Sequence, residues 1–262
     1  MAGWTDAHNH LQDPRLGDSA AVIAAMRAAG VERCIVNATR EQDWAAVEGL
    51  ALAHPGFVIP AFGIHPWQAH TAECGWRERL AGMLEKHPHS SIGECGLDQW
   101  VSTPPMEIQR PVFLDQLRLA GEMKRPATIH CLKAWGSLFE CFSEVPPPGK
   151  FLMHSFGGSI ETARRLIRLG AFFSFSGHFL HERKSAVIEV FRQLPRDRIL
   201  LETDAPDMRP PDAFVTHPLA GNGNHPANLP VIGRALAAAL GMPPEELAAL
   251  TRSNAEHFRS GG

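Results

Sequence analysis

Histidine pairs and carboxylates at the ends of short apolar segments give this 262-residue chain the side chains that bind divalent metal ions. The first motif is His8-Asn9-His10. Side chains at positions i and i+2 of a β-strand point to the same face, so His8 and His10 can converge on one ion. Two polar residues at the end of a strand are the alternative interpretation of this motif.

Two carboxylate motifs occupy comparable positions. Glu94 follows the short apolar segment 91–93 and is flanked by glycines, which let the backbone approach another group closely. A carboxylate at this point can bridge two cations. Glu202 and Asp204 end the segment 199–202, and alternation points both to one face, with Glu202 deeper as a supporting residue. Helix capping, ion pairing and a turn before Pro206 are the alternatives.

Two further histidines end apolar segments. His130 closes the segment 127–130 and His154 closes the segment 151–154. A hydrogen-bonded histidine in the core is the alternative for each of them taken alone.

The elements that must position these side chains are short strands that alternate with amphipathic helices. Strands are predicted at 4–8, 33–37, 58–62, 91–93, 127–130, 151–154, 172–175 and 199–202. Helices are predicted at 19–29, 41–53, 76–87, 106–123, 136–144, 160–169, 184–193, 229–240 and 244–258. Eight strands that each precede a helix predict an α/β protein, a (β/α)8 TIM barrel in which residues 1–262 form a single domain. An open doubly wound sheet is the alternative, although it would favour a glycine-rich loop after the first strand.

In a barrel, the carboxyl ends of all strands meet in one mouth, where active sites of this fold lie. Four histidines and two carboxylates exceed what a single tetrahedral ion with an open position needs. They match two divalent cations bridged by a carboxylate and a water, with Mg²⁺, Mn²⁺ and Zn²⁺ as candidate metals. The predicted metal ligands are His8, His10, Glu94, His130, His154 and Asp204.

Composition excludes several classes of protein. The chain has 25 Lys and Arg against 28 Asp and Glu, a net charge of −3, which argues against a protein that coats nucleic acid. Five cysteines without a C-x-x-C pair argue against a disulfide framework and favour a reducing, cytoplasmic location. We see no signal peptide, no membrane-spanning segment and no sign of an obligate protein partner.

The chain resembles the TatD-type metal-dependent hydrolases, TIM-barrel relatives of the amidohydrolases. The resemblance rests on six ordered motifs: DAHNHL at 6–11, GIHP at 63–66, IGECGLD at 92–98, IHC at 129–131, HSFGG at 154–158 and LETDAP at 201–206. It implies a two-metal site formed by the six predicted ligands. It also implies phosphodiester hydrolysis, usually DNase activity and often 3′→5′ exonucleolytic, with His65 beside the metals in contact with a substrate phosphate.

The motifs depart from the usual family pattern around the substrate. The family often has His-Cys-Arg-Asp at the fifth strand, where this chain has Leu132 and Lys133 after His-Cys. Lys133 is therefore a candidate phosphate contact, with a solvated residue at a helix start as the alternative. An Asn-Glu-Pro pattern is usual late in the chain, and here His225 stands at its centre. The metal ligands are thus intact while the surroundings of the substrate differ.

These observations predict a divalent-metal-dependent hydrolase, a phosphodiesterase or deoxyribonuclease acting on DNA or a small phosphodiester through a metal-bridging hydroxide. Asp204 and Glu94 are the predicted catalytic residues. Asp204 would orient the water and accept its proton, and Glu94 would hold the two metals. A binuclear hydrolase of another ester, a lactone or an amide is the alternative, and a non-catalytic metal or nucleic-acid binder is a third possibility.

Several mouth residues have no assigned role. Trp67 and Trp100 can stack a nucleobase or serve as packing. We expect at most one or two of the loop histidines to contact substrate: His178, His181, His217 and His225.

Overall fold

A computed structural model of the protein describes residues 3–100 and 104–260. Eight parallel strands pair in chain order within this part of the chain. The strands are β1 (Trp4–Asn9), β2 (Val31–Asn37), β3 (Val58–Phe62), β4 (Ser91–Asp98), β5 (Ala127–Leu132), β6 (Phe151–Met153), β7 (Ala171–Ser176) and β8 (Ile199–Glu202). This order is that of a TIM barrel, which confirms the predicted fold class.

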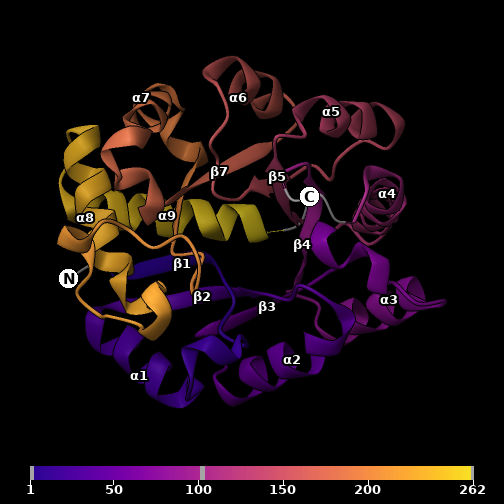
Figure 1. The fold of residues 1–262 in the computed structure, drawn as a ribbon, viewed down its shortest axis with the longest axis horizontal. Coiled ribbons are helices and arrows are strands. Elements are labelled where there is room, and N and C mark those ends of the chain that lie inside the picture. The colour runs from indigo at the N-terminus through magenta and orange to yellow at the C-terminus, as the bar shows by residue number, and fades with distance from the viewer. Residues whose placement is uncertain (1–2, 101–103, 261–262) are drawn as a thin grey trace.

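Helices surround the strands (Figure 1). They are α1 (Ser19–Ala29), α2 (Trp44–Ala53), α3 (Trp76–Lys86), α4 (Met106–Glu122), α5 (Trp135–Glu144), α6 (Ile160–Ile167), α7 (Ser185–Gln193), α8 (Leu229–Leu240) and α9 (Pro244–Arg259). Side-chain caps begin two of these helices. The Asp18 carboxylate accepts the Ala20 N–H at the start of α1, and the Ser159 hydroxyl accepts the Thr162 N–H at the start of α6.

The last strand meets the first through hydrogen bonds that continue beyond the end of β8. The N–H of Asp204 donates to the carbonyl of His8 (3.0 Å), and the N–H of His10 donates to the carbonyl of Ala205 (2.8 Å). Both bonds are made by backbone groups of predicted metal ligands. Closure of the barrel therefore also brings the ends of β1 and β8 together.

Two apolar clusters lie on opposite faces of the sheet. Cys34 and Val36 of β2 belong to the larger cluster, which includes the surrounding helices, whereas Ile35 between them belongs to a smaller one. Because successive strand residues point to opposite faces, the smaller cluster fills the barrel interior. It includes Phe258 of α9. Another α9 residue, Asn254, donates to the carbonyl of Ile199 at the start of β8 (2.8 Å), so α9 lies at the amino-terminal end of the barrel.

The largest difference from the predicted elements is in β4, which continues to Asp98 instead of ending at 93. Its extra residues pair with β5, from Cys95 opposite Ile129 to Asp98 opposite Leu132. The motif around Glu94 is therefore strand instead of loop, and pairing with β5 holds its backbone. The strand prediction stopped early because glycine and acidic residues are depleted in strands.

Candidate metal centre

The structure brings all six predicted ligands to the carboxyl ends of the strands. His8, Glu94 and His130 lie within β1, β4 and β5, while His10 and His154 directly follow β1 and β6. Asp204 lies two residues beyond β8 with a left-handed φ of 52°, so strand alternation no longer describes its direction. Its position in the centre comes from the hydrogen bonds that join β8 to β1.

Four donor atoms form a first group around His8 and His10. The two Nε2 atoms are 3.2 Å apart. Oε2 of Glu94 lies 3.3 Å from each of them, and Oδ1 of Asp204 lies 3.3 Å from His8 and 3.5 Å from His10. Tetrahedral ligands at 2.0–2.1 Å from one ion are separated by roughly 3.3–3.4 Å. The spacing of this group therefore fits a bound divalent cation.

The other oxygen of Glu94 faces a second group. Its Oε1 lies 2.8 Å from Nε2 of His154 and 3.1 Å from Nδ1 of His130. Those two nitrogens are 3.1 Å apart. Glu94 thus presents one carboxylate oxygen to each group, which is the geometry of a bridging ligand.

Hydrogen bonds on the far side of two rings select the nitrogen that faces each group. Nδ1 of His10 lies 2.8 Å from the carbonyl of Asn37, and Nε2 of His130 lies 2.9 Å from Oδ2 of Asp98. An oxygen without a proton can only accept, so each of these nitrogens carries the hydrogen. When the ring is neutral, the opposite nitrogen holds the lone pair that a metal ligand requires.

His65 has the reverse arrangement. The N–H of Trp67 donates to Nδ1 of His65 (3.1 Å), so the neutral ring carries its hydrogen on Nε2. Burial lowers the pKa of His65 to about 4, which keeps the ring neutral. Its Nε2 lies 3.3 Å from Oε1 of Glu94. Although His65, Glu94 and His130 are close enough to share an ion, this tautomer makes His65 a hydrogen-bond donor.

Gln116 of α4 holds the segment that carries His65. Its side chain accepts the N–H of Ile64 (2.8 Å) and donates to the carbonyl of the same residue (3.0 Å). Gln116 is fully buried, so both of its polar groups are used within the protein. The position of His65 is thus fixed by a residue 51 places further along the sequence.

Charges in the centre stabilise one another. Burial alone would raise the pKa of Glu94, but the surrounding histidines hold it well below its usual range. Burial alone would lower the pKa values of His10 and His154, but the carboxylates raise both well above the ordinary value. Protons thus occupy the ring nitrogens that a cation would bind, and a metal ion must displace them.

Glu202 lies next to the second group of donor atoms, near His154. Its Oε1 accepts the N–H (2.7 Å) and the hydroxyl (2.6 Å) of Ser155, and its Oε2 accepts the hydroxyl of Ser174. The same Oε1 lies 3.7 Å from Nδ1 of His154. Glu202 is buried and fully bonded, which agrees with the expected deeper, supporting position.

A cavity of about 760 Å³ opens over both groups, and its rim carries arginines together with Asp13, Asp43 and Asp207. Arg15, Arg40, Arg183 and Arg209 line it, together with His178 and His181. The sequence analysis missed these arginines. Each lies in a loop that follows β1, β2, β7 or β8, and that position was the available signal.

The remaining candidate residues at the mouth differ in whether they line the cavity. Nζ of Lys133 lies 3.8 Å from the centre of the Trp100 ring, a cation–π contact, and neither residue lines the cavity among the described residues. The His217 and His225 rings stack on each other at 5.6 Å. Trp67 does line the cavity, and its indole N–H donates to Asp98 (2.8 Å). Substrate contact by Lys133 stays a prediction.

Asp98 is a further residue that sequence analysis did not assign. Burial would raise its pKa, but the hydrogen bond and charge of His130, together with hydrogen bonds from Trp100 and Trp67, lower it to about 2. The carboxylate is therefore charged at neutral pH and orients the His130 ring. Its place at the end of the IGECGLD motif was the signal that could have identified it.

Over the part of the chain that the structure describes, no helix combines the length and the apolar composition needed to cross a bilayer.

Comparison with known proteins covers nearly the whole chain. The family profile described as TatD related DNase matches residues 5–259. The chain is 32% identical to the uncharacterized metal-dependent hydrolase YabD of Bacillus subtilis over 97% of each chain. It is 31% identical to the 3′-5′ ssDNA/RNA exonuclease TatD of Rahnella, over 91% of this chain and 90% of that one. The crystal structure of YjjV, a TatD homolog from Escherichia coli, superposes with a TM-score of 0.88 at 29% identity, covering 97% of both chains.

Proposed function

Because the chain belongs to the family of TatD-related DNases, we propose that it is a metal-dependent phosphodiesterase that removes nucleotides from the 3′ end of DNA. Its relatives include a metal-dependent hydrolase and 3′-5′ ssDNA/RNA exonucleases at 31–32% identity. Those names support hydrolysis of phosphodiester bonds and a nucleic-acid substrate.

The observation that carries the proposal is the position of Glu94. One of its oxygens faces His8, His10 and Asp204, and the other faces His130 and His154. This arrangement supports two divalent cations, the first held by His8, His10 and Asp204 and the second by His130 and His154, with Glu94 between them. Nitrogen and carboxylate donors together are compatible with Zn²⁺ and Mn²⁺, and phosphate oxygens of a substrate would add to the ligands of Mg²⁺.

Bound cations of this kind lower the pKa of water and neutralise charge on a phosphate. Side chains of the protein supply proton transfer and hydrogen bonds to the substrate. Asp204 would orient the attacking water and accept its proton. Neighbouring histidines lower the pKa of Asp204 despite burial, so its carboxylate is ionised. The Nε2–H of His65 donates a hydrogen bond to a non-bridging phosphate oxygen, because the Trp67 N–H keeps that hydrogen in place.

The arginines of the rim are suited to a polyanionic strand. Arg40 and Arg183 line the cavity that opens over the metal ligands. Arg15 does too, although it is paired with Asp13 and Asp207 (2.8 and 2.7 Å). The arginine side chains around the mouth would bind the phosphates that flank the scissile bond. Trp67 adds an aromatic face, 45% exposed, on which a base can stack.

We also infer a reducing, cytoplasmic compartment. The five cysteines are unpaired, and three of them are buried. Free thiols of this number are typical of proteins outside the secretory route.

The test compares substrates on one enzyme preparation. Chelator-stripped protein is reconstituted with Mg²⁺, Mn²⁺ or Zn²⁺ and given a 5′-labelled single-stranded DNA oligonucleotide. Matched oligonucleotides carry a phosphorothioate at the 3′-terminal or the 5′-terminal linkage. We expect stepwise shortening that the 3′-terminal modification blocks and the 5′-terminal one does not. Hydrolysis of a carboxylic ester or lactone panel without cleavage of any oligonucleotide would overturn the proposal.

A further inference from the structure

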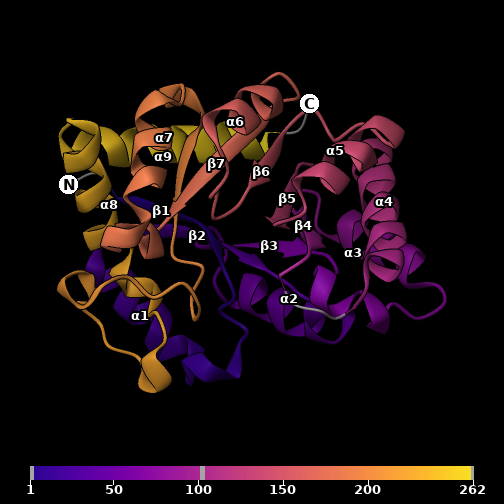
Figure 2. The same ribbon diagram turned by 45° about the horizontal axis from the view of Figure 1, so that its top comes forward.

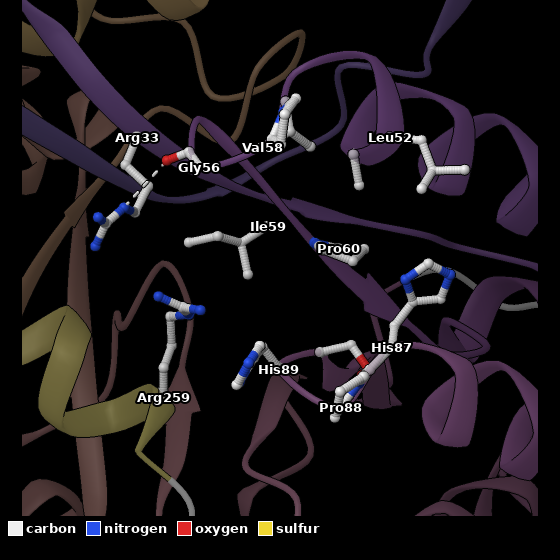
Figure 3. Close-up of a pocket in the computed structure, with 13 residues that line it drawn as sticks. Arg33, Leu52, Gly56, Val58, Ile59, Pro60, His87, Pro88, His89 and Arg259 are labelled. Carbon is white, nitrogen blue, oxygen red and sulfur yellow. Dashed lines mark hydrogen bonds between the residues drawn. The ribbon is translucent and has the colours of Figure 1, made fainter.

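A second cavity lies at the end of the barrel opposite the candidate metal centre (Figure 3). Its volume is about 330 Å³. Its walls come from the first residues of β3, from the segments that lead into β3 and β4, from Arg33 of β2 and from Arg259 of α9. Among the described residues, it shares none with the cavity over the metal ligands. It is therefore a separate candidate site.

Two arginines line one side of this cavity. Figure 3 shows Arg33 and Arg259 coming from different elements toward the same side of the space, with Ile59 above Arg259 and His89 beside it. Burial lowers the pKa of Arg259, and the charge of Arg33 lowers it further. Like charges that line the same cavity repel each other, so an anion between them would relieve the repulsion.

The two arginines lack sufficient counter-charge. Nη1 of Arg33 lies 3.4 Å from Oε1 of Glu256, whose side chain is 57% exposed. Nε of Arg33 donates to the carbonyl of Gly56 (3.4 Å). Nε of Arg259 is buried and has no hydrogen-bond partner among the described residues. One exposed carboxylate thus offsets two guanidinium groups, and the charge on this side of the cavity is incompletely neutralised.

The opposite wall of the cavity is apolar. Leu52, Ile59, Pro60 and Pro88 line it, and Leu52 is 65% exposed despite being apolar. His87 also lies there, but its Nε2 is already 2.6 Å from the Glu48 carboxylate, which in turn pairs with Lys86. The positive charge is therefore concentrated on the side of Arg33 and Arg259.

From this arrangement we propose that the cavity binds a small organic phosphate. Its dianionic group lies between Arg33 and Arg259, and its apolar body lies against Leu52 and Ile59. Guanidinium groups bind phosphate through paired hydrogen bonds. Two guanidinium groups favour a ligand with two negative charges, such as a phosphate group, over a singly charged carboxylate. The volume lies at the small end of ligand sites and suits a single ring with its phosphate group.

The test is calorimetric titration of the metal-loaded protein with phenylphosphonate, a dianion on an aromatic ring without an ester bond. Any binding at the metal centre is common to all variants compared. We expect Arg259→Gln to remove one binding event or weaken it at least tenfold. Arg252→Gln is the matched control, since Arg252 lies on the same helix and pairs with Glu32 outside the cavity. It should bind as the wild type does.

A second pair of variants tests the apolar wall. Leu52→Glu places a negative charge beside the ligand and should weaken phenylphosphonate binding, whereas Leu169→Glu, at an exposed leucine elsewhere, should not. Inorganic phosphate should bind more weakly than phenylphosphonate. Identical isotherms for wild type and Arg259→Gln would overturn the site, and equal affinities for the two ligands would overturn the role of the wall. Thermal unfolding of each variant establishes that it is folded.

Discussion

At the scale of single residues, the environment behind each ring sets the chemistry of the candidate centre. His10 and His65 are both buried histidines near Glu94. Nδ1 of His10 meets a carbonyl, whereas Nδ1 of His65 meets an N–H. The first ring therefore offers a lone pair to a metal, and the second offers a hydrogen to a phosphate. The same residue type takes two roles because its hydrogen-bond partners differ.

Asp204→Asn separates proton transfer from metal binding. The amide keeps the shape and one oxygen donor but loses the charge and the basicity. If Asp204 accepts the proton of the attacking water, single-turnover rates should fall by roughly two to four orders of magnitude. Metal content and substrate affinity should change much less. Glu202→Gln is the control, because Glu202 is held by Ser155 and Ser174 and should lose stability before chemistry. Near-normal turnover in Asp204→Asn with metals bound would refute the mechanism.

Metal counting tests the bridging position of Glu94. We expect about two metals per chain in the wild type at saturation. The double variant His130→Ala/His154→Ala should hold one, since it removes the nitrogens that face Oε1 of Glu94. His217→Ala, at a ring that stacks on His225 outside the cavity, should still hold two. Elemental analysis after dialysis provides the measurement, and one metal in the wild type contradicts the prediction.

Metal affinity should depend on pH. The carboxylates raise the pKa values of His10 and His154, so in the metal-free protein protons bind these rings more strongly than in a free histidine. A cation must displace those protons, and apparent affinity should therefore fall as pH is lowered from about 8 to about 6. Titration in buffers of different ionisation enthalpy counts the protons released. An affinity that is constant over this range, with no proton release, contradicts the prediction.

At the scale of elements, one buried carboxylate joins the first strand to the last. Asp6 accepts the N–H (3.0 Å) and the hydroxyl (2.6 Å) of Thr203, and also the side-chain N–H of Asn9 (3.0 Å). Burial raises the pKa of Asp6 to about 6, against the effect of these bonds. The contact lies directly below His8 and Asp204, so it sets the spacing of two predicted ligands.

Asp6→Asn should weaken this junction. The new amide N–H group would face donors instead of acceptors, and a buried unsatisfied group costs about 1–3 kcal/mol. The urea midpoint should fall, and metal affinity should fall with it. Asp115→Asn is the control, because Asp115 forms an exposed pair with Arg118 on α4 and such pairs contribute about 0–1 kcal/mol. Equal midpoints for Asp6→Asn and the wild type would contradict the assigned role.

At the scale of the whole molecule, the two candidate sites lie at opposite ends of the barrel of strands, which Figure 2 shows from a second direction. The predicted metal ligands lie at the carboxyl ends of the strands, and the cavity with Arg33 and Arg259 lies at the amino ends. Between them lies the apolar interior that includes Ile35, Phe172 and Phe258. Stability therefore rests on a packed core that does not include the metal centre.

Removal of the metals should abolish hydrolysis without unfolding the barrel. The interior and the helix–strand layer are packed without any metal-facing group, so far-UV circular dichroism should be unchanged in chelator. Activity should return when the cations are restored. Loss of the circular dichroism signal on chelation would instead make the ions structural and weaken the catalytic proposal.

The sequence by itself determined the order of strands and helices and the residue types at the mouth. Strand and helix patterns are local properties, since side chains alternate along a strand and recur every three to four residues along a helix. Six ligands at the ends of apolar segments therefore predicted a shared site once eight strands had been counted. The predicted strands and helices differ from the structure at their ends, as at β4, where pairing with β5 extends the strand through residues of low strand propensity.

Tertiary structure alone decided the properties that depend on contacts between distant segments. The tautomer of His10 comes from the carbonyl of Asn37, 27 residues away, and Asp6 meets Thr203 across 197 residues. The arginines of the rim and of the opposite cavity likewise come from separate loops and strands. No pattern along the chain reports such contacts, because hydrogen bonds and charge pairs depend on distances that exist only after the barrel has closed.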